Sequence, residues 1–173
     1  MTPDFSRNHF ELLGLPVAFA LDPARLESSY RELQGAVHPD RFAAASDAER
    51  RIAMQWATHA NEAYRTLRDP LERARYLLRL RGFDTEEETN TSMPPDFLMQ
   101  QMEWREGVAA ARAAHDAAAL ESLEREIGVA RSEMLGQLER ALEGANYQAG
   151  CSLVRKLRFL EKLGDEIEEA LED

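Results

Sequence analysis

The stretch YRELQGAVHPDRF, residues 30–42, decides the fold of the first half of this chain. Its apolar residues belong to a series spaced by four, three and four residues, which predicts one face of an amphipathic helix; the series is Leu26, Tyr30, Leu33 and Val37. Pro39 ends that helix, because proline lacks an amide hydrogen and disfavours helical geometry in the residue before it. The stretch therefore predicts a helix that ends in a tight turn, His38-Pro39-Asp40.

Three more helices are predicted around this turn within residues 1–81. The helix before the turn begins after Asp22-Pro23, since aspartate caps the first amides and proline suits the first helical position. A short helix over residues 8–13 precedes it. A third helix opens near Ser46-Asp47 with the apolar series Ile52, Trp56, Ala60, Ala63 and Leu67. A fourth covers residues 71–80, and we expect Tyr76, Leu77 and Leu80 to face inward.

Residues 83–95, FDTEEETNTSMPP, are polar and acidic and end in two prolines, which is typical of a linker. We place a domain boundary there, with one domain over residues 1–82 and another over 96–173. Three longer helices with a regular three–four spacing are predicted after the linker, separated by short turns at residues 115–116 and 144–146. They predict a three-helix bundle, so the whole chain is expected to be all-α.

Composition and charge exclude several classes of function. The 173 residues carry a net charge of −11, divided into +1 over residues 1–81 and −12 over residues 82–173. An acidic second half argues against nucleic acid as a partner, because phosphate binding needs a basic face. One cysteine, Cys151, allows no internal disulfide and no cysteine-rich zinc site. We expect a cytoplasmic protein with no membrane span, metal, cofactor or small-molecule substrate.

The helices beside the His38-Pro39-Asp40 turn decide whether it has a function. Taken alone it is equally a simple turn between helices, with proline as the helix stop. The helix before it and the segment ATHANEAYRTLRDPLERARYLL, residues 57–78, together resemble the J-domain family. The resemblance implies two antiparallel helices joined by the turn, which stimulates ATP hydrolysis by a DnaK-type chaperone. Arg25, Arg31 and Arg41 are expected to add positive charge. The basic run before the turn is sparser than is usual in the family, and Val37 replaces a typical tyrosine.

The first helix of the predicted bundle carries more apolar residues than one core needs. At about 100° per residue, one face of this helix contains Phe97, Trp104, Val108 and Ala111. Leu98, Met99 and Met102 project from another face, more than about 90° away. Phe159 also lies off the main stripe of the last helix. These residues cover a contact between the two domains, enlarge the core, or form a docking patch for a protein client. In the last case Glu103 and Glu106 form an acidic rim that favours a basic client.

The segments YLLRLRGFD (residues 76–84), FLMQQMEWREGV (97–108) and VRKLRFLEKL (154–163) extend the resemblance to the second domain. In this order they resemble the HscB family, the J-proteins dedicated to iron–sulfur cluster assembly. The resemblance implies HscA as the partner ATPase and the scaffold protein IscU as the client. It places scaffold binding on six positions: Leu98, Met99, Met102, Glu103, Glu106 and Phe159. Met102 stands where the family usually has leucine, a change that similar volumes make tolerable.

Two other functions fit parts of the sequence. A general J-protein would hold unfolded clients of DnaK, but the chain has neither a Gly/Phe-rich linker nor a β-rich peptide-binding domain. An enzyme would use His38, Asp40 and His59 as acid–base groups, but no nucleophile arrangement or cofactor loop accompanies them. The sequence therefore favours a co-chaperone that catalyses nothing itself.

Overall fold

The computed structural model describes residues 6–87 and 92–172, which form seven α-helices and one short 3-10 helix and contain no strand. The prediction of an all-α fold is confirmed. The chain divides into two compact units, Met1–Leu77 and Leu78–Asp173, and the division falls within α4. The expected linker, residues 83–95, includes 88–91, which lie outside the described residues. The expected boundary at residue 82 stays a prediction.

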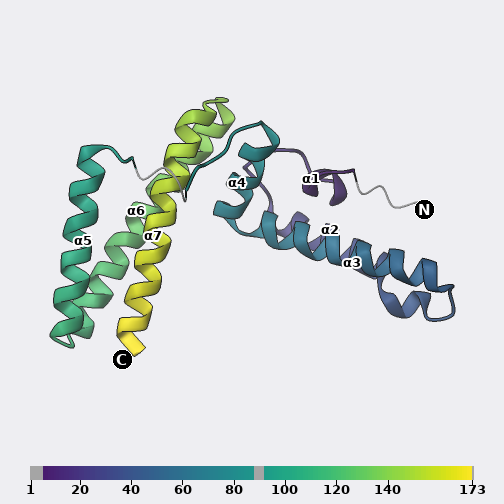
Figure 1. The fold of residues 1–173 in the computed structure, drawn as a ribbon, viewed down its shortest axis with the longest axis horizontal. Helices are drawn as coiled ribbons and strands as arrows, with labels where there is room; N and C mark the ends of the chain where they lie inside the picture. Colours follow the sequence, from purple (N-terminus) through teal and green to yellow (C-terminus); the bar gives the residue numbers. More distant parts are fainter. Residues whose placement is uncertain (1–5, 88–91, 173) are drawn as a thin grey trace. The chain divides into compact units, whose positions relative to one another are not determined.

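The first unit is a helical hairpin with three short helices packed against it. It contains α1 (His9–Leu12), α2 (Pro23–Val37), the 3-10 helix η1 (Pro39–Phe42), α3 (Asp47–Arg68) and most of α4 (Pro70–Leu80). Figure 1 shows α2 and α3 side by side, joined by the turn at their shared end. Each long helix begins at a side-chain cap, because Asp22 accepts a hydrogen bond from the amide of Ala24 and Ser46 accepts one from Glu49.

The inward face of α3 is made largely of alanine. Its buried residues are Ala53, Ala60, Ala63 and Leu67, while Trp56 is half-buried. Ile52, which belongs to the apolar series of this helix, is exposed, while its neighbour Ala53 is buried. Leu80 at the end of α4 was predicted to face inward, and that prediction is wrong, because its side chain is exposed. A search of the sequence for large apolar side chains misses a buried face that is made of alanine.

Arg73 and Tyr76 of α4 tie the remaining parts of the first unit together. Arg73 is buried, donates from Nη1 to the carbonyl oxygen of Leu67 at 2.6 Å, and lies over the ring of Phe19 at 5.0 Å. Tyr76 accepts a hydrogen bond at its hydroxyl from the amide of His9 and stacks on the His9 ring at 4.2 Å. These contacts hold α4 and the N-terminal segment against the base of the hairpin.

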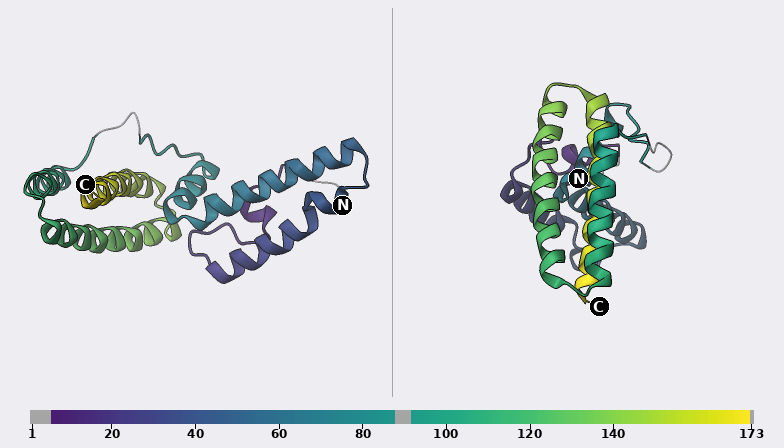
Figure 2. Two further views of the ribbon diagram at one scale, coloured as in Figure 1. Left: turned by 90° about the horizontal axis from the view of Figure 1, so that it is seen from below. Right: turned by 90° about the vertical axis from the view of Figure 1, so that its left-hand side faces the viewer.

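The second unit is the predicted three-helix bundle, seen from two further sides in Figure 2. Its helices are α5 (Pro95–Ala113), α6 (Ala117–Glu143) and α7 (Tyr147–Glu172). The turns that join them place His115 and Ala145 at positive φ, 50° and 55°. One core cluster spans all three helices and contains Phe97, Trp104, Val108, Ala111, Leu120, Ile127, Leu160, Leu163 and Ile167.

The chain that follows α4 packs against the start of α7. Phe83 contacts the ring of Tyr147, and Arg155 donates to the carbonyl oxygen of Thr85 at 3.0 Å. Cys151 lies buried nearby, and burial is the main cause that raises the pKa of its thiol. We propose that residues 83–87 belong to the second unit rather than to a free linker. Within residues 6–87 and 92–172, no helix has both the length and the hydropathy needed to cross a membrane.

Candidate functional site

The turn between α2 and α3 presents an imidazole and a carboxylate at the end of the hairpin. The His38 side chain is 51% exposed and that of Asp40 is 90% exposed. His38 caps η1, since its Nδ1 accepts a hydrogen bond from the amide of Asp40 at 3.3 Å, and its carbonyl accepts one from the amide of Arg41 at 3.0 Å. The backbone of Pro39 begins η1, while its side chain lies outside the described residues. The turn is therefore fixed locally and open to a partner.

Arg41 fastens the turn to the helix before it. Its Nη1 donates to the carbonyl oxygen of Gly35 at 3.0 Å. That carbonyl lies in the last turn of α2, where backbone acceptors lack partners within the helix. The guanidinium is exposed and still has donors for a second acceptor, because arginine carries five N–H groups. Arg41 can thus hold the turn and contact a partner at once.

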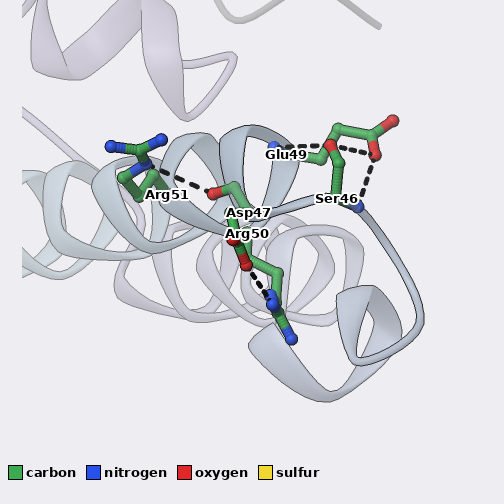
Figure 3. Close-up of polar contacts among 5 residues, drawn as sticks. All are labelled: Ser46, Asp47, Glu49, Arg50 and Arg51. Atoms are coloured by element: carbon green, nitrogen blue, oxygen red, sulfur yellow. Dashed lines mark hydrogen bonds and ion pairs between the residues drawn. The ribbon is translucent and has the colours of Figure 1, made fainter.

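The start of α3 fixes the other side of the turn, as Figure 3 shows. Ser46 and Glu49 form a capping box, in which Ser46 Oγ accepts from the amide of Glu49 and Glu49 Oε2 accepts from the amide of Ser46 at 2.9 Å. The hydroxyl and amide of Ser46 lower the pKa of the Glu49 carboxyl. Arg50 pairs with Asp47, and Arg51 donates to the Asp47 carbonyl oxygen. This helix start holds the exit from the turn.

Two tyrosines join α2 and α3 in the middle of the hairpin. The rings of Tyr30 and Tyr64 stack with centroids 4.2 Å apart. Tyr30 donates its hydroxyl hydrogen to Asn61 Oδ1 and Tyr64 donates to Glu27 Oε2, each at 2.6 Å. Sequence reasoning assigned Tyr30 to the buried stripe and missed these polar contacts between helices. They keep the two helices in register and so hold the turn in place.

The three arginines expected to support the turn occupy separate positions. Arg31 pairs with Glu27 at 2.8 Å, and Arg25 lies exposed in the first turn of α2. At 1.5 Å per residue, Arg25 stands roughly 20 Å from His38 along the helix. Arg25 and Arg31 project about 120° apart at 100° per residue. Only Arg41 lies in the turn itself, and the role of the other two stays a prediction.

The surplus face of α5 is exposed in the bundle. Exposed fractions are 43% for Leu98, 59% for Met99 and 62% for Met102, while the opposite face is buried in the core. Glu103 and Glu106 are exposed beside them. Leu98, Met99 and Met102, together with Phe159 of α7, are called the α5/α7 patch from here on. Three large apolar side chains on adjacent turns of one helix are typical of a protein-binding surface.

Phe159 connects the α5/α7 patch to the core. It is half-buried and meets Phe97 edge to face, with centroids 6.0 Å apart. The guanidinium of Arg105 lies over the Phe159 ring at 5.3 Å, and the ammonium of Lys156 lies over Phe97 at 5.2 Å. Sequence reasoning missed Arg105 and Lys156, although Arg105 follows Met102 by three residues and so shares its face. The rim of the patch is therefore mixed in charge rather than only acidic.

Comparison with known proteins gives one consistent family. The model of the HSCB C-terminal oligomerisation domain matches residues 93–168. A co-chaperone protein HscB homolog from Burkholderia vietnamiensis is 54% identical over 160 residues, which are 92% of this chain and 91% of that relative. The structure resembles chaperone HscB from Vibrio cholerae, with a TM-score of 0.82, 41% identity and coverage of 94% and 96%. It also resembles human co-chaperone protein HscB, with a TM-score of 0.92, 31% identity and coverage of 98% and 84%.

Proposed function

This chain belongs to the HscB family of co-chaperones, and on that premise we propose that it carries an IscU-type iron–sulfur scaffold to the DnaK-type ATPase HscA. In this function the His38-Pro39-Asp40 turn stimulates ATP hydrolysis by HscA, and the second unit binds the scaffold. The chain itself catalyses no reaction. The result is support for iron–sulfur cluster transfer and for maturation of iron–sulfur proteins.

The observation that carries the proposal is the rigid display of the turn. An imidazole and a carboxylate stand exposed at the end of a hairpin that is capped on both sides of the turn. A carboxylate and a ring nitrogen can form charge-assisted hydrogen bonds to an arginine or a backbone group of a partner. Because the supporting helices fix their positions, little conformational freedom is lost on binding. Arg41 contributes a cation at the same place.

The α5/α7 patch supports scaffold binding by a separate surface. Its Leu and Met side chains are exposed, and Phe159 packs against Phe97 of the core. Flexible methionines suit contact with a protein surface, and buried apolar anchors supply most of the affinity at such interfaces. Glu103, Glu106 and Arg105 would then set the orientation of the scaffold through their charges.

One experiment tests the turn: the ATPase rate of HscA with this chain, with and without scaffold, measured for the native chain and for His38→Gln. We expect His38→Gln to abolish stimulation and to leave scaffold affinity unchanged, because the substitution is confined to the turn. His59→Gln, on α3 and outside the turn, is the matched control and should stimulate normally. Full stimulation by His38→Gln would refute the role assigned to the turn. A parallel series with DnaK tests whether HscA is the preferred ATPase.

The α5/α7 patch is tested by replacing Leu98, Met99 and Phe159 together with alanine. Apolar anchors contribute about 2 kcal/mol each, so scaffold affinity should fall by at least about 100-fold. Stimulation of HscA in the absence of scaffold should not change. Val129→Ala on α6 removes a side chain as exposed as Met99 and serves as the control. Scaffold affinity equal to that of the native chain would exclude the patch as the docking surface.

A further inference from the structure

The end of the bundle at which α6 and α7 join extends past α5. α6 has 27 residues and α5 has 19, so α6 and its neighbour α7 continue for roughly 12 Å with no third helix beside them. Figure 1 shows this end running past the start of α5. Its apolar side chains are nevertheless buried, each at most 7% exposed: Leu138, Leu142, Val154 and Leu157. Another part of the chain therefore covers them.

A short segment that follows α4 lies across this end. Phe83 packs its ring against Tyr147 at the start of α7, with centroids 5.2 Å apart. Thr85 is polar but buried, with 9% of its surface exposed. Residues 83–87 form neither helix nor strand and are called the strap from here on. The strap supplies part of the cover that α5 does not provide.

Arg155 of α7 fastens the middle of the strap. Its Nη1 donates to the carbonyl oxygen of Thr85 at 3.0 Å. A bond from a guanidinium is charge-assisted and therefore stronger than one between neutral groups. The Nε–H of the same side chain is buried, and no acceptor for it lies among the described residues. Because a buried donor without an acceptor costs free energy that water would restore, the closed strap is held by a fastening that is incompletely satisfied.

The strap also holds a backbone conformation that is costly for its sequence. Glu86 has a φ of 53°, in the left-handed region that a residue with a side chain rarely adopts. Two local hydrogen bonds support it, since the Glu86 amide donates to Asp84 Oδ1 at 2.9 Å and the Thr85 hydroxyl donates to Glu87 Oε1 at 2.7 Å. Such a conformation persists only where its surroundings hold it. The strap is therefore easier to open than the helices beneath it.

We propose that residues 83–87 open and close as one local unit, with Arg155 as the clasp, while α6 and α7 stay folded. Segments with few buried contacts open locally at a smaller free energy than the whole chain. This inference concerns the second unit alone and is independent of the proposed function. Its natural probe is Cys151, the single cysteine of the chain, which lies one turn before Arg155 and is 6% exposed.

The thiol of Cys151 lies close to the strap. Burial is the main cause that raises its pKa, and the carboxylates of Asp84 and Glu86 raise it further. The guanidinium of Arg155 acts in the opposite direction and lowers the pKa. A closed strap keeps thiol reagents away from Cys151, and an open strap admits them. The rate of thiol labelling therefore measures how often the strap opens.

The experiment is labelling of the full chain with the aromatic disulfide DTNB, at several urea concentrations below the unfolding transition. The Cys151 thiolate attacks the S–S bond, forms a mixed disulfide and releases a coloured thiolate. We expect slow labelling with little dependence on urea, because opening of a short segment exposes little surface. A urea dependence equal to that of global unfolding would overturn the inference. Labelling of the native chain as fast as that of the unfolded chain would overturn it as well.

Substitutions at the clasp test the role of Arg155. Arg155→Met removes the donor to Thr85 and should accelerate labelling severalfold, less than the full worth of the bond because the unpaired Nε–H is lost too. Loss of the cation alone would raise the thiol pKa and slow labelling, so acceleration reports opening. Arg158→Met removes an exposed arginine of the same helix, paired with Glu161, and serves as the matched control. Labelling of Arg155→Met at the native rate would exclude Arg155 as the clasp.

Phe83→Ala provides a second test that leaves α7 unchanged. It removes the ring that packs on Tyr147, so labelling should accelerate about tenfold, the effect of losing roughly 1.4 kcal/mol from such a contact. The free energy of global unfolding, measured by urea for each variant, shows whether the chain as a whole is still folded. If Arg155→Met is unfolded, Phe83→Ala decides the inference by itself. Native labelling rates in Phe83→Ala would show that the strap does not control access to the thiol.

Discussion

Tyr64 shows how a single hydroxyl group acts on the α2–α3 hairpin. Its O–H donates to Glu27 at 2.6 Å across the two helices. This bond is the main cause that lowers the pKa of the Glu27 carboxyl, and the neighbouring Arg31 and Arg68 add to it. The same bond raises the pKa of the Tyr64 phenol. The pair is thus most stable with Glu27 ionised and Tyr64 protonated, which is the state at neutral pH.

Tyr64→Phe should raise the pKa of Glu27 toward its ordinary value. A carboxyl whose pKa is lower in the folded chain stabilises the fold above its unfolded pKa, and this contribution is lost as the pH falls through the folded value. The native chain should therefore exceed Tyr64→Phe in stability at neutral pH, and the difference should shrink in acid. Urea unfolding at neutral pH and at a pH of about 3 measures this difference.

Tyr30→Phe is the matched control for that measurement. It also removes a hydroxyl group between α2 and α3, but the acceptor of Tyr30 is the neutral amide of Asn61. The stability lost in Tyr30→Phe should therefore stay constant over the pH range in which Glu27 titrates. A stability difference for Tyr64→Phe that does not vary with pH would contradict the role given to the bond between Tyr64 and Glu27.

At the scale of whole elements, two glycines in the bundle predict opposite effects of the same substitution. Gly128 is an exposed position within α6, and an added methyl group would meet nothing within 4 Å. Gly128→Ala should stabilise the chain by about 0.5–1 kcal/mol, because alanine costs less backbone entropy in a helix. Thermal and urea unfolding measure this gain.

Gly150 in α7 has the opposite surroundings. It is buried, and an added methyl group would lie 3.2 Å from Leu142 Cδ2 and 3.4 Å from Leu78 Cδ2. Gly150→Ala should therefore cost about 1 kcal/mol, since overpacking outweighs the gain in helix propensity. Equal gains in stability for Gly128→Ala and Gly150→Ala would show that the contact with Leu142 and Leu78 exerts no constraint.

The order of the helices could be predicted from sequence because their ends carry local signals. Asp22-Pro23, Ser46 and Pro95 each mark a helix start that depends on neighbouring residues alone. The inward face of α3 could not be predicted as well. Ile52 is exposed and Ala53 is buried, so a small residue rather than the larger neighbour takes the buried position. Which residues of α3 are buried depends on the elements that pack against it, and the apolar periodicity of one helix carries no information about those elements.

The candidate sites also contain features that the sequence predicts and features that it does not. Periodicity correctly separated the buried face of α5 from the exposed Leu98, Met99 and Met102. It did not reveal that Arg105 covers the ring of Phe159, because that contact joins two helices far apart in sequence. The bond from Arg41 to Gly35 was missed for a related reason, since it depends on how the chain folds back after the turn.

At the scale of the whole molecule, the two units carry different charges and different candidate surfaces. Residues 1–81 have a net charge of +1 and contain the turn, while residues 82–173 have a net charge of −12 and contain the α5/α7 patch. Each unit buries apolar residues of its own. The proposed function needs both surfaces in one chain, because the scaffold must be brought to the ATPase that is being stimulated.

That requirement predicts the behaviour of a mixture of two defective chains. His38→Gln keeps the α5/α7 patch, and the triple alanine variant at Leu98, Met99 and Phe159 keeps the turn. If one chain must hold both partners, the mixture should not restore the extra HscA stimulation that scaffold gives with the native chain. The linkage raises the effective concentration of scaffold near the ATPase, an advantage that separate chains lack. The measurement is the HscA ATPase rate with scaffold for each variant and for the mixture.

Restored stimulation in the mixture would point to an assembly of two chains, because the matched family model for residues 93–168 describes an oligomerisation domain. If the second unit joined two chains, a mixed assembly would hold one intact turn and one intact patch, and stimulation would return in part. A dilution series distinguishes a mixed assembly from chains that act singly. Stimulation recovered through a mixed assembly falls on dilution, because the chains dissociate. The native chain acting alone keeps its stimulation per molecule. Recovery that persists on dilution would show that turn and patch need not share a chain, and would refute delivery by a single adaptor.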